Sequence, residues 1–573
     1  MVLLMPSSKY RIVLTKKAGE VSFFLPRIEK GEELVSITQS VCPYCYRTLP
    51  AAIVERDGKL YIKRVCPEHG VVDEVYYEDV EIYKKFDVWD LEGRGPRHIY
   101  TPIKNVCPFN CGLCPLHKNH TALVNIVLTN RCNLSCWYCF FYAEASGYVY
   151  EPTLEQIINM VRAVKKQNIP VSVQLTGGEP TLRDDLVDIV RAIKAEGTTH
   201  IQLNTNGIKF AELYLEEPMK AIEYARALRR AGVNTVYLSF DGVTPVTNWK
   251  NHWEIPYIFE VFRKAGMTST VLVPTVIRGI NDHELGLIIR FAAKHSDVVR
   301  GVNFQPVSLT GLMKRREREK YRITIPGAIK KIEEQTEGEI PREAWYPVPV
   351  SAVFSRFIEG FSGQFKLEMD NHPVCGAATY VYVEKSGGKI KLIPITNFVD
   401  VEGLLEYLRD KWVDLISGSS RVVVGMKILY TLRKFIDKNR APKEFDLYKI
   451  LFNIIVRRSY DALAELHYKM LFLGMMHFMD LYNYDIQRVM RCNIHYAVPD
   501  GRLIPFCAFN IFDDIYRDSI QKKYGVPIKE WAKLHGYSED IVTKKYIRNR
   551  KALEESPIYK EAYKGIKDQA LRR

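Results

Sequence analysis

The 573-residue sequence has no uninterrupted apolar stretch of about 20 residues, the length that a helix needs to cross a bilayer. It also lacks, near its first residue, a charged segment followed by an apolar run and a small-residue cleavage site. These absences argue against a membrane-spanning helix and against a secretory signal peptide. We therefore expect a cytoplasmic protein, at most peripheral at a membrane surface.

Cysteine is scarce for a disulfide scaffold, with 12 residues in the whole chain. Cysteines at short, regular spacings instead favour metal binding in a reducing compartment. We sort them into the N-terminal trio (Cys42, Cys45, Cys66), the second trio (Cys107, Cys111, Cys114), the central trio (Cys132, Cys136, Cys139) and the C-terminal trio (Cys375, Cys492, Cys507).

Acidic residues are fewer than basic ones, 67 against 81, which gives a formal charge of +14. Such a balance favours an anionic partner, namely nucleic acid, an acidic cofactor or a phospholipid surface. The basic stretch 311–338 is typical of a solvated helix or loop, with phosphate binding as the alternative. No interleaved basic and aromatic motif is present, so we expect no nucleic acid partner.

The central trio follows an apolar run, 123–129, and its cysteines are separated by three and then two residues. Three thiolates can hold three irons of a four-iron four-sulfur (4Fe-4S) cluster and leave the fourth iron without a protein ligand. This spacing resembles the signature of the radical S-adenosylmethionine (SAM) superfamily. The resemblance implies that Cys132, Cys136 and Cys139 carry the catalytic cluster and that Tyr138, inside the motif, lies beside SAM.

Polar turns follow the next predicted strands. Gly177-Gly178-Glu179-Pro180 ends the run 171–176, and its two glycines let the backbone approach a ligand closely. The Glu179 carboxylate can take an ammonium group, and in the superfamily this element holds the amino group of SAM. By the same resemblance Asn204 contacts the cofactor, and Ser239 and Asp241 face its ribose or carboxylate.

Six apolar, β-rich runs alternate with amphipathic helical stretches, which predicts an α/β fold with a parallel sheet and right-handed crossovers. This resembles the partial (β/α)6 barrel of the superfamily, with SAM at the carboxyl ends of the strands. We expect an N-terminal metal-binding knuckle and cluster domain before it and an α-rich C-terminal cluster-binding region after it. The runs are 123–129, 171–176, 200–204, 235–240, 268–276 and 301–306.

The N-terminal trio begins with a Cys-Pro-Tyr-Cys knuckle and continues with Cys66 on the second arm of a predicted hairpin. Tetrahedral sulfur sites suit zinc and iron equally, so we expect either zinc or a mononuclear rubredoxin-like iron. The fourth ligand is either His69 or a cysteine from the second trio.

The second trio repeats the spacing of the central trio, but no second barrel follows it, which favours an auxiliary 4Fe-4S cluster. The C-terminal trio is dispersed, and two of its members, Cys492 and Cys507, flank a predicted hairpin turn at 498–502. We expect a second auxiliary cluster there. Twelve cysteines cannot supply every ligand of three clusters and a mononuclear ion, so at least one site uses another ligand or an open iron.

We expect four regions: a metal and cluster domain (1–118), the barrel (119–310), a basic, helical substrate-binding region (311–470) and a C-terminal cluster region (471–573). The segment 447–481 is rich in methionine, phenylalanine and aliphatic residues. We interpret it as helical core, with contact to a long apolar ligand as the alternative.

The paired cysteine motifs, the N-terminal knuckle and the C-terminal cysteine pair together resemble the archaeal tetraether lipid synthases, once described as a pterin methyltransferase-like group. The resemblance implies C–C coupling between terminal methyl carbons of isoprenoid chains, with two SAM-derived hydrogen abstractions. It also implies an archaeal ether phospholipid as substrate, contact with an anionic membrane surface and an electron donor such as a ferredoxin.

Two alternatives remain open from the sequence. The same barrel and clusters suit a radical SAM methyltransferase or a peptide-modifying enzyme with a compact polar substrate. A zinc-ribbon protein that binds nucleic acid, with only structural cysteines, is the non-catalytic alternative.

Overall fold

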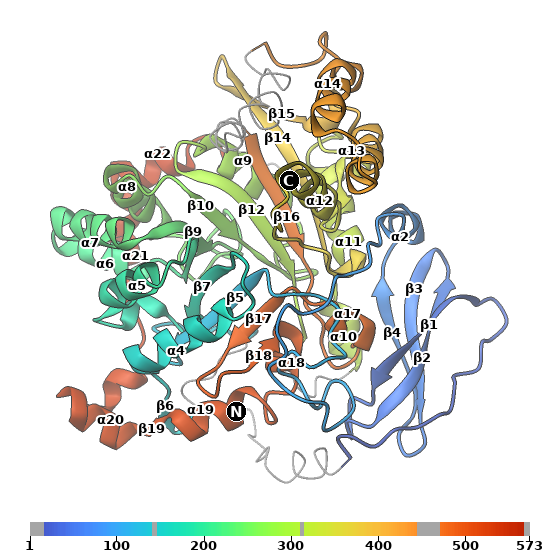
Figure 1. Cartoon of the computed structure of the whole chain (residues 1–573). Helices are drawn as coiled ribbons and strands as arrows, with labels where there is room; N and C mark the ends of the chain where they lie inside the picture. The colour runs from blue at the N-terminus through green and yellow to red at the C-terminus, as the bar shows by residue number, and fades with distance from the viewer. Residues whose placement is uncertain (1–16, 140–145, 310–314, 444–469, 567–573) are drawn as a thin grey trace.

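The computed structural model describes residues 17–139, 146–309, 315–443 and 470–566 (Figure 1). A four-stranded antiparallel sheet forms a separate layer at one side of the molecule. Its strands pair in chain order: β1 (Glu33–Val41), β2 (Thr48–Arg56), β3 (Lys59–Cys66) and β4 (Gly70–Tyr77). Asp57 and Gly58 both have positive φ, as a tight two-residue hairpin turn requires.

Six parallel strands form the centre of the second sheet, and each of the six predicted runs overlaps one of them. The fifth run is split, because Pro274 has no N–H to donate; it resumes after this residue as β11 (Thr275–Val276). In sheet order the six strands are β5 (Leu123–Thr129), β7 (Ser172–Gly177), β8 (Ile201–Thr205), β9 (Val233–Ser239), β10 (Thr270–Val273) and β12 (Val299–Pro306).

Helices connect these strands as the α/β prediction requires. Thr153 begins α4 with a capping box that it shares with Gln156, which explains the sharp start of this helix. Apolar residues on one side of each helix are buried against the sheet. The connecting helices are α4 (Leu154–Lys165), α5 (Leu186–Ala195), α6 (Ile208–Glu216), α7 (Pro218–Ala231), α8 (Ile255–Ala265) and α9 (Leu285–Lys294).

Later parts of the chain extend the sheet at both edges. At one edge β16 (Met470–Met476) pairs parallel with β12 and antiparallel with β14 (Gly376–Ser386), which carries β13 (Tyr346–Pro347) and β15 (Lys389–Pro394). At the other edge β17 (Ile494–Ala497) pairs parallel with β5, and β18 (Leu503–Pro505) pairs antiparallel with β17. The sheet is therefore mixed, and the C-terminal region adds strands to it that the sequence analysis did not predict.

Met470–Met476 corrects one particular prediction. We expected helix across 447–481, but this part is β16, buried in the interior of the sheet. A continuous apolar run fits a buried strand and a buried helix equally well, so periodicity could not separate the two. The segment 444–469 lies outside the described residues.

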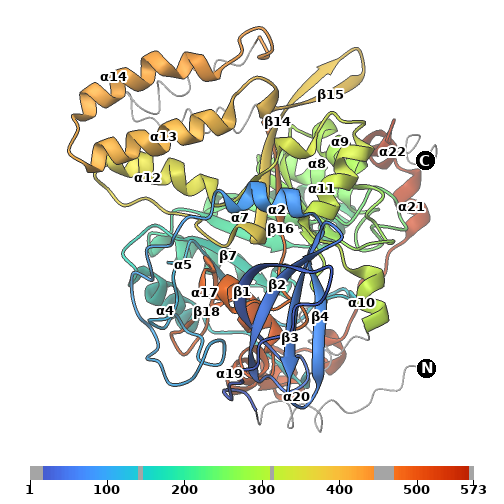
Figure 2. The same cartoon turned by 90° about the vertical axis from the view of Figure 1, so that its right-hand side faces the viewer.

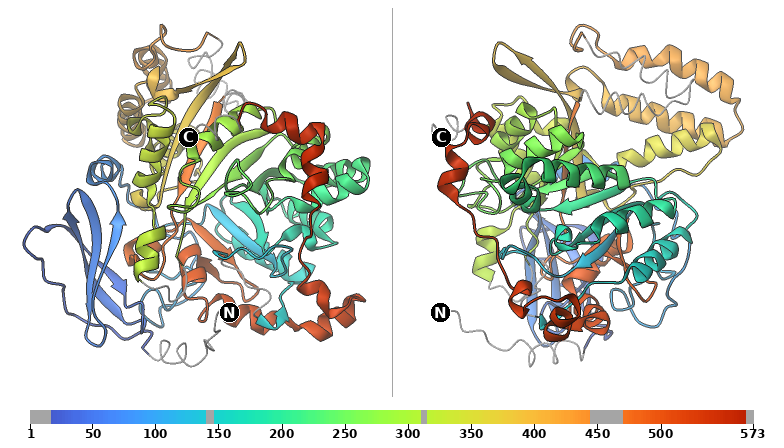
Figure 3. Two further views of the ribbon diagram at one scale, coloured as in Figure 1. Left: turned by 180° about the vertical axis from the view of Figure 1, so that it is seen from behind. Right: turned by 90° about the vertical axis from the view of Figure 1, so that its left-hand side faces the viewer.

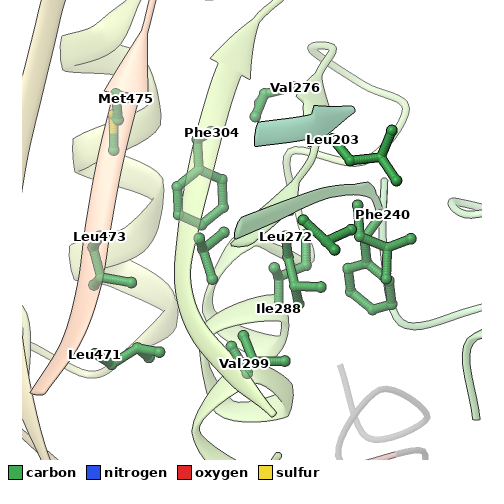
Figure 4. Packing of buried hydrophobic residues seen from close by; sticks show 14 of the residues in the cluster. Leu203, Phe240, Leu272, Val276, Ile288, Val299, Phe304, Leu471, Leu473 and Met475 are labelled. Carbon is green, nitrogen blue, oxygen red and sulfur yellow. The ribbon is translucent and has the colours of Figure 1, made fainter. Parts of the chain in front are cut away.

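The largest apolar core lies between the parallel strands and their helices (Figure 4). Leu272 on β10, Phe304 on β12 and Leu473 on β16 are fully buried and come from three neighbouring strands, with Ile288 of α9 against them. This continuous core joins the added strand β16 to the barrel strands. The carboxyl ends of the strands are thereby held in fixed register.

The basic stretch is only partly solvated. It forms α10 (Arg315–Tyr321) and α11 (Ile325–Gln335). Arg318 and Arg322 are buried, because Arg318 pairs with Glu74 of the N-terminal sheet and Arg322 with Asp480. Charge runs do not reveal such partners, which lie far away in the sequence.

Three helices form an arm beyond the sheet edge (Figure 2): α12 (Val350–Ser362), α13 (Val401–Ile416) and α14 (Arg421–Thr431). Helix α2 (Val80–Asp87) follows the N-terminal sheet and is capped by Asp79. Within the described ranges no helix is long and apolar enough to cross a membrane.

The C-terminal segment returns along the barrel (Figure 3). Its β19 (Val526–Pro527) pairs with β6 (Tyr148–Val149), and Tyr257 of α8 donates a hydrogen bond to the Leu553 carbonyl. The helices of this part are α17 (Ile486–Met490), α18 (Phe506–Ile511), α19 (Arg517–Tyr524), α20 (Ile528–His535), α21 (Arg550–Glu555) and α22 (Pro557–Tyr563).

Candidate active site and metal centres

The central trio lies on the loop after β5, and all three of its cysteines line one large cavity. Lys545 fixes this loop, because its Nζ donates to the carbonyl oxygens of Cys132 and Leu134 at 2.9 and 3.3 Å. Burial raises the pKa of Cys136 to about 12 and also raises that of Cys132. The buried thiols therefore favour the protonated form until a metal ion displaces the proton.

The turn Gly177-Gly178 lies directly against the cluster loop. A Cβ on Gly177 would be 2.2 Å from the Thr129 carbonyl oxygen, and one on Gly178 would be 2.0 Å from that of Arg131. The Gly178 N–H donates to Thr129 O and the Glu179 N–H to Arg131 O, both at 2.8 Å. Only glycine permits this approach, which brings the predicted SAM-binding turn next to the predicted cluster ligands.

Glu179 is buried and its carboxylate accepts four hydrogen bonds within the protein. The donors are the N–H and hydroxyl of Thr181 (3.0 and 2.6 Å), the Thr205 hydroxyl (2.6 Å) and the Asn206 N–H (2.7 Å). Burial raises the pKa of Glu179, although these bonds oppose the shift. The carboxylate thus joins the ends of β7 and β8, and its predicted contact with an ammonium group stays a prediction.

Asp241 is 2% exposed and lies beneath the cavity wall. Its Oδ2 accepts from Lys250 Nζ at 2.9 Å and from the Tyr138 hydroxyl, and its Oδ1 from the Thr275 N–H at 3.0 Å. Lys250, Tyr138, Asn204 and Ser239 line the cavity. Burial opposes the charge on Lys250, but Asp241 and Cys136 together raise its pKa above the ordinary value.

The cavity has a volume of about 950 Å³ and two chemically different ends. The floor of the cavity, which is the side formed by the sheet, carries amide side chains from β5, β7, β8 and β12. The Oε1 atom of Gln202 is buried and has no hydrogen-bond partner. The amides are Asn125, Gln174, Gln202, Asn204, Asn303 and Gln305.

The other end of the cavity is apolar. Phe354 and Phe357 of α12 line it together with Leu404, Leu405 and Leu408 of α13. An apolar wall of this kind keeps bulk water away from reactive species formed beside the cluster.

The N-terminal trio forms a four-ligand site with His69. Cys45 Sγ lies 3.8 Å from Cys66 Sγ, and His69 Nδ1 lies 3.6 Å from Cys42 Sγ and 3.4 Å from Cys66 Sγ. Tetrahedral zinc bonds of about 2.3 Å to sulfur and about 2.0–2.1 Å to nitrogen place ligand atoms roughly 3.6–3.8 Å apart. The site is therefore Cys3His, and the alternative of a fourth, rubredoxin-like cysteine from the second trio is wrong.

The second trio lies on a loop between the two sheets. The Cys111 N–H donates to the Tyr516 hydroxyl at 3.0 Å, and Tyr516 donates to the Pro108 carbonyl, so the residue that caps α19 holds this loop in place. Its three cysteines line one small pocket. Burial raises the pKa of Cys107 and brings that of Cys111 to about 12.

The C-terminal trio is assembled from three distant segments. Cys375 ends a short 3-10 helix, Cys492 precedes β17, and Cys507 lies in α18 after the predicted hairpin, which the structure confirms as β17 and β18. Each of Cys492 and Cys507 interacts electrostatically with both other thiols. Burial raises the pKa of Cys492 and brings that of Cys507 to about 12.

Buried polar atoms without partners surround the C-terminal trio. The Tyr77 and Tyr484 hydroxyls and His477 Nε2 have no hydrogen-bond partner among the described residues. Tyr77 interacts electrostatically with Cys375, and Tyr484 with Cys507 and Cys111. Buried polar groups are rarely left unpaired, so these donors fit a sulfide-containing cluster.

Ligand spacing separates the trios from one another. Among the described residues, only Cys42, Cys45, Cys66 and His69 have ligand atoms that all lie within 4.8 Å of one another. The wider spacing of the other trios suits a multi-iron cluster better than a single ion. His69 supplies one of the ligands that the twelve cysteines cannot provide.

Sequence reasoning missed two residues of these sites. Lys250 contacts Asp241 from a polar segment after β9, and Arg488 donates to the thiol of Cys375. Neither belongs to a recognisable motif. Only the nearby strand end at 233–239 could have drawn attention to Lys250.

Two families match parts of the chain. Residues 126–292 match the radical SAM superfamily, and residues 34–78 match the HMPTM N-terminal zinc ribbon domain. The first range contains the central trio and the second contains the Cys3His site. From these matches and from the geometry we conclude that the protein is a radical SAM enzyme. It uses a 4Fe-4S cluster and SAM, and it has a zinc-ribbon metal site.

A curated relative covers most of the chain. The 7,8-dihydro-6-hydroxymethylpterin dimethyltransferase of Methanocaldococcus jannaschii is 46% identical over 510 residues, which are 87% of this chain and 97% of that protein. The chain belongs to this pterin dimethyltransferase family.

Other relatives and solved structures are less similar to this chain. GTP 3',8-cyclase 3 of Mycobacterium bovis is 30% identical over 198 residues, 32% of this chain and 49% of that protein. The solved structure of native anSMEcpe with bound AdoMet and Cp18Cys peptide covers 60% of this chain and 99% of its own, at 15% identity and a TM-score of 0.29.

Membership of the pterin dimethyltransferase family corrects the expected resemblance to archaeal tetraether lipid synthases. The expected function, C–C coupling of isoprenoid chains, and the expected ether phospholipid partner are wrong as well. The cysteine motifs and the knuckle gave the wrong substrate because they report cluster and metal binding and carry no information about the molecule held in the cavity.

Proposed function

We propose that this chain is a radical SAM methyltransferase that acts on 7,8-dihydro-6-hydroxymethylpterin, the compound in the name of its 46% identical relative. The proposal takes up the compact polar substrate that the sequence left open as an alternative. One SAM molecule is proposed as the source of each radical and a separate SAM molecule as the source of each methyl group, because methionine keeps its methyl group when SAM is cleaved to the radical.

The amide-lined floor of the cavity is the observation that carries this proposal. A pterin presents alternating hydrogen-bond donors and acceptors along its ring edge, and asparagine and glutamine offer both in one side chain. Gln202 has a buried Oε1 without a partner and lines the cavity together with Gln174 and Asn125. A planar heterocycle that paired with these groups would lie in the same cavity as the central trio.

The surrounding residues supply the cofactor site in this proposal. Cys132, Cys136 and Cys139 would hold the cluster, and Gly177, Gly178, Asn204 and Ser239 would contact SAM, with Tyr138 packed alongside. When bound, the cluster supplies the electron that cleaves SAM to methionine and a 5'-deoxyadenosyl radical.

Lys250 would carry the electrostatic part of SAM binding. Its ammonium group suits the SAM carboxylate, and Asp241 holds it in place from below. Asp241 itself does not line the cavity, so its proposed role is to orient Lys250 and Tyr138.

The remaining trios have supporting roles in this proposal. The second and C-terminal trios would hold auxiliary iron–sulfur clusters that pass electrons. Both trios lie near Tyr484, and Cys507 of the C-terminal trio is next in sequence to Phe506, which lines the cavity. The Cys3His site of the ribbon would be structural, since all four of its positions are filled by protein ligands.

Pterin binding to matched cavity variants tests the proposed substrate. The dissociation constant for 7,8-dihydro-6-hydroxymethylpterin is measured anaerobically for wild type, for Gln202→Leu at the amide end and for Leu405→Ala at the apolar end. Loss of a buried hydrogen-bond pair costs about 1.5 kcal/mol, or roughly tenfold.

We expect Gln202→Leu to bind the pterin at least tenfold more weakly and Leu405→Ala to bind it as wild type does. Equal affinities for all three proteins, or a selective loss in Leu405→Ala, would refute the assignment of the amide floor to the pterin. Iron content and thermal unfolding show whether the variants are otherwise intact.

A further inference from the structure

Arg488 is a buried cation without a carboxylate partner. It lies in α17 with 2% of its surface exposed, and its Nη2 donates to the His477 carbonyl at 2.8 Å. Two other buried arginines form ion pairs with carboxylates, Arg318 with Glu74 and Arg322 with Asp480. Within the described ranges no carboxylate forms an ion pair with Arg488.

The partner of Arg488 is a sulfur atom. Its Nε donates to Cys375 Sγ at 3.3 Å, and the thiol of Cys507 is also within electrostatic range of the guanidinium group. Burying an uncompensated charge costs several kcal/mol, so a nearby anion stabilises a buried guanidinium group. Thiolate sulfur at the C-terminal trio would supply that anion when a cluster is bound.

Arg64 is buried in a different way. Arg64 is fully buried and its guanidinium group donates only to carbonyl oxygens, those of Val41, Leu481 and Tyr482. Carbonyl groups can hold a buried arginine in place without carrying charge. The sulfur contact of Arg488 is therefore a specific feature of this site and is not needed merely to bury an arginine.

We propose that Arg488 is a positioning residue for an iron–sulfur cluster held by Cys375, Cys492 and Cys507, and that it raises the reduction potential of this cluster. Reduction adds one electron to the cluster, and a fixed positive charge with a hydrogen bond to a ligand sulfur stabilises the more negative state. This proposal rests on the auxiliary cluster of the proposed function.

Potentiometry monitored by electron paramagnetic resonance tests the proposal. The full chain is prepared with Cys132, Cys136 and Cys139 replaced by alanine, so that the catalytic cluster is absent. The signal of the C-terminal trio is identified as the one that Cys492→Ser removes. Arg488→Met and Arg488→Lys are then compared in this background with Arg548→Met, which removes a largely buried arginine paired with Glu254.

We expect Arg488→Met to lower the midpoint potential by at least 59 mV, which corresponds to a tenfold change in a one-electron equilibrium. Arg488→Lys keeps the charge but loses the Nε donor, so its shift is smaller. Arg548→Met leaves the potential unchanged.

Two results would overturn the role of Arg488. One is an unchanged potential in Arg488→Met with full iron and sulfide. The other is loss of the cluster in both Arg488 variants while the ribbon keeps its metal, which would make Arg488 a packing requirement. A parent protein without a signal that depends on Cys492 would instead refute the auxiliary cluster, so the two failures can be told apart.

Discussion

Replacement of Gly178 by alanine tests whether close contact between the glycine turn and the cluster loop sets SAM binding. A Cβ at this position would lie 2.0 Å from the carbonyl oxygen and 2.6 Å from the carbonyl carbon of Arg131, the residue before Cys132. Because a real Cβ stays at least 3.0 Å from such atoms, the two backbones must separate by about 1 Å. Overpacking of this kind costs about 1–3 kcal/mol.

Separation of the two loops moves the cluster ligands away from the SAM-binding turn. A misplacement of about 1 Å can cost roughly 100-fold in rate. We therefore expect reconstituted Gly178→Ala to keep its iron but to bind SAM at least tenfold more weakly in equilibrium dialysis. Deoxyadenosine formation, measured by chromatography, should fall by about 100-fold.

Gly425→Ala in α14 is the matched control. The nearest atom to a Cβ there is the Phe361 ring at 3.6 Å, an ordinary contact. Alanine favours helix by about 1 kcal/mol over glycine, so this variant should be equally or more stable and should bind SAM normally. Wild-type SAM affinity in iron-loaded Gly178→Ala would refute the reasoning.

Three further predictions concern the ribbon, the SAM site and an internal ion pair. His69→Ala should lose the ribbon metal in elemental analysis while His69→Cys keeps it; metal retained in His69→Ala would disprove the Cys3His site. Lys250→Met should weaken SAM binding at least tenfold and should destabilise the fold by about 3–5 kcal/mol, because Asp241 stays buried without its ion-pair partner. Adding Asp241→Asn should restore stability but not SAM affinity, and recovery of both would exclude the role of Lys250. Burial would raise the pKa of Asp480, but Arg322 lowers it below the unfolded value of about 3.9. The ion pair therefore stabilises the fold above that pH, and this stabilisation is lost as the pH falls through the lowered pKa. Asp480→Asn should make the unfolding free energy depend less steeply on pH in acid, and an unchanged dependence would contradict this.

The barrel could be predicted from the sequence because its signals are local. Each parallel strand is a short apolar run followed by a polar turn, and Gly177-Gly178 marks a close approach that other residues would block. The six strands and the position of the central trio follow from these features.

The edges of the sheet could not be predicted, because pairing at an edge depends on residues far away in the chain. Met470–Met476 pairs with β12 and β14, and nothing in its own composition identifies these neighbours. The same holds for Ile494–Ala497 beside β5.

Some residues of the candidate site could likewise be predicted from the sequence, and others could not. Cysteine spacing located the central trio and the ribbon, but charge partners such as Lys250 and Arg488 emerge only when the fold brings them to Asp241 and Cys375. The substrate was predicted wrongly because cavity chemistry depends on single amides contributed by four strands, and no motif records them.

Incubation with methyl-deuterated SAM tests the central claim most directly. Reconstituted protein, a chemical reductant, the labelled SAM and 7,8-dihydro-6-hydroxymethylpterin are combined anaerobically, and the products are analysed by mass spectrometry. The account predicts pterin that carries deuterated methyl groups together with deoxyadenosine, and neither product from Cys136→Ala. Deoxyadenosine formed while the pterin remains unmethylated would contradict it.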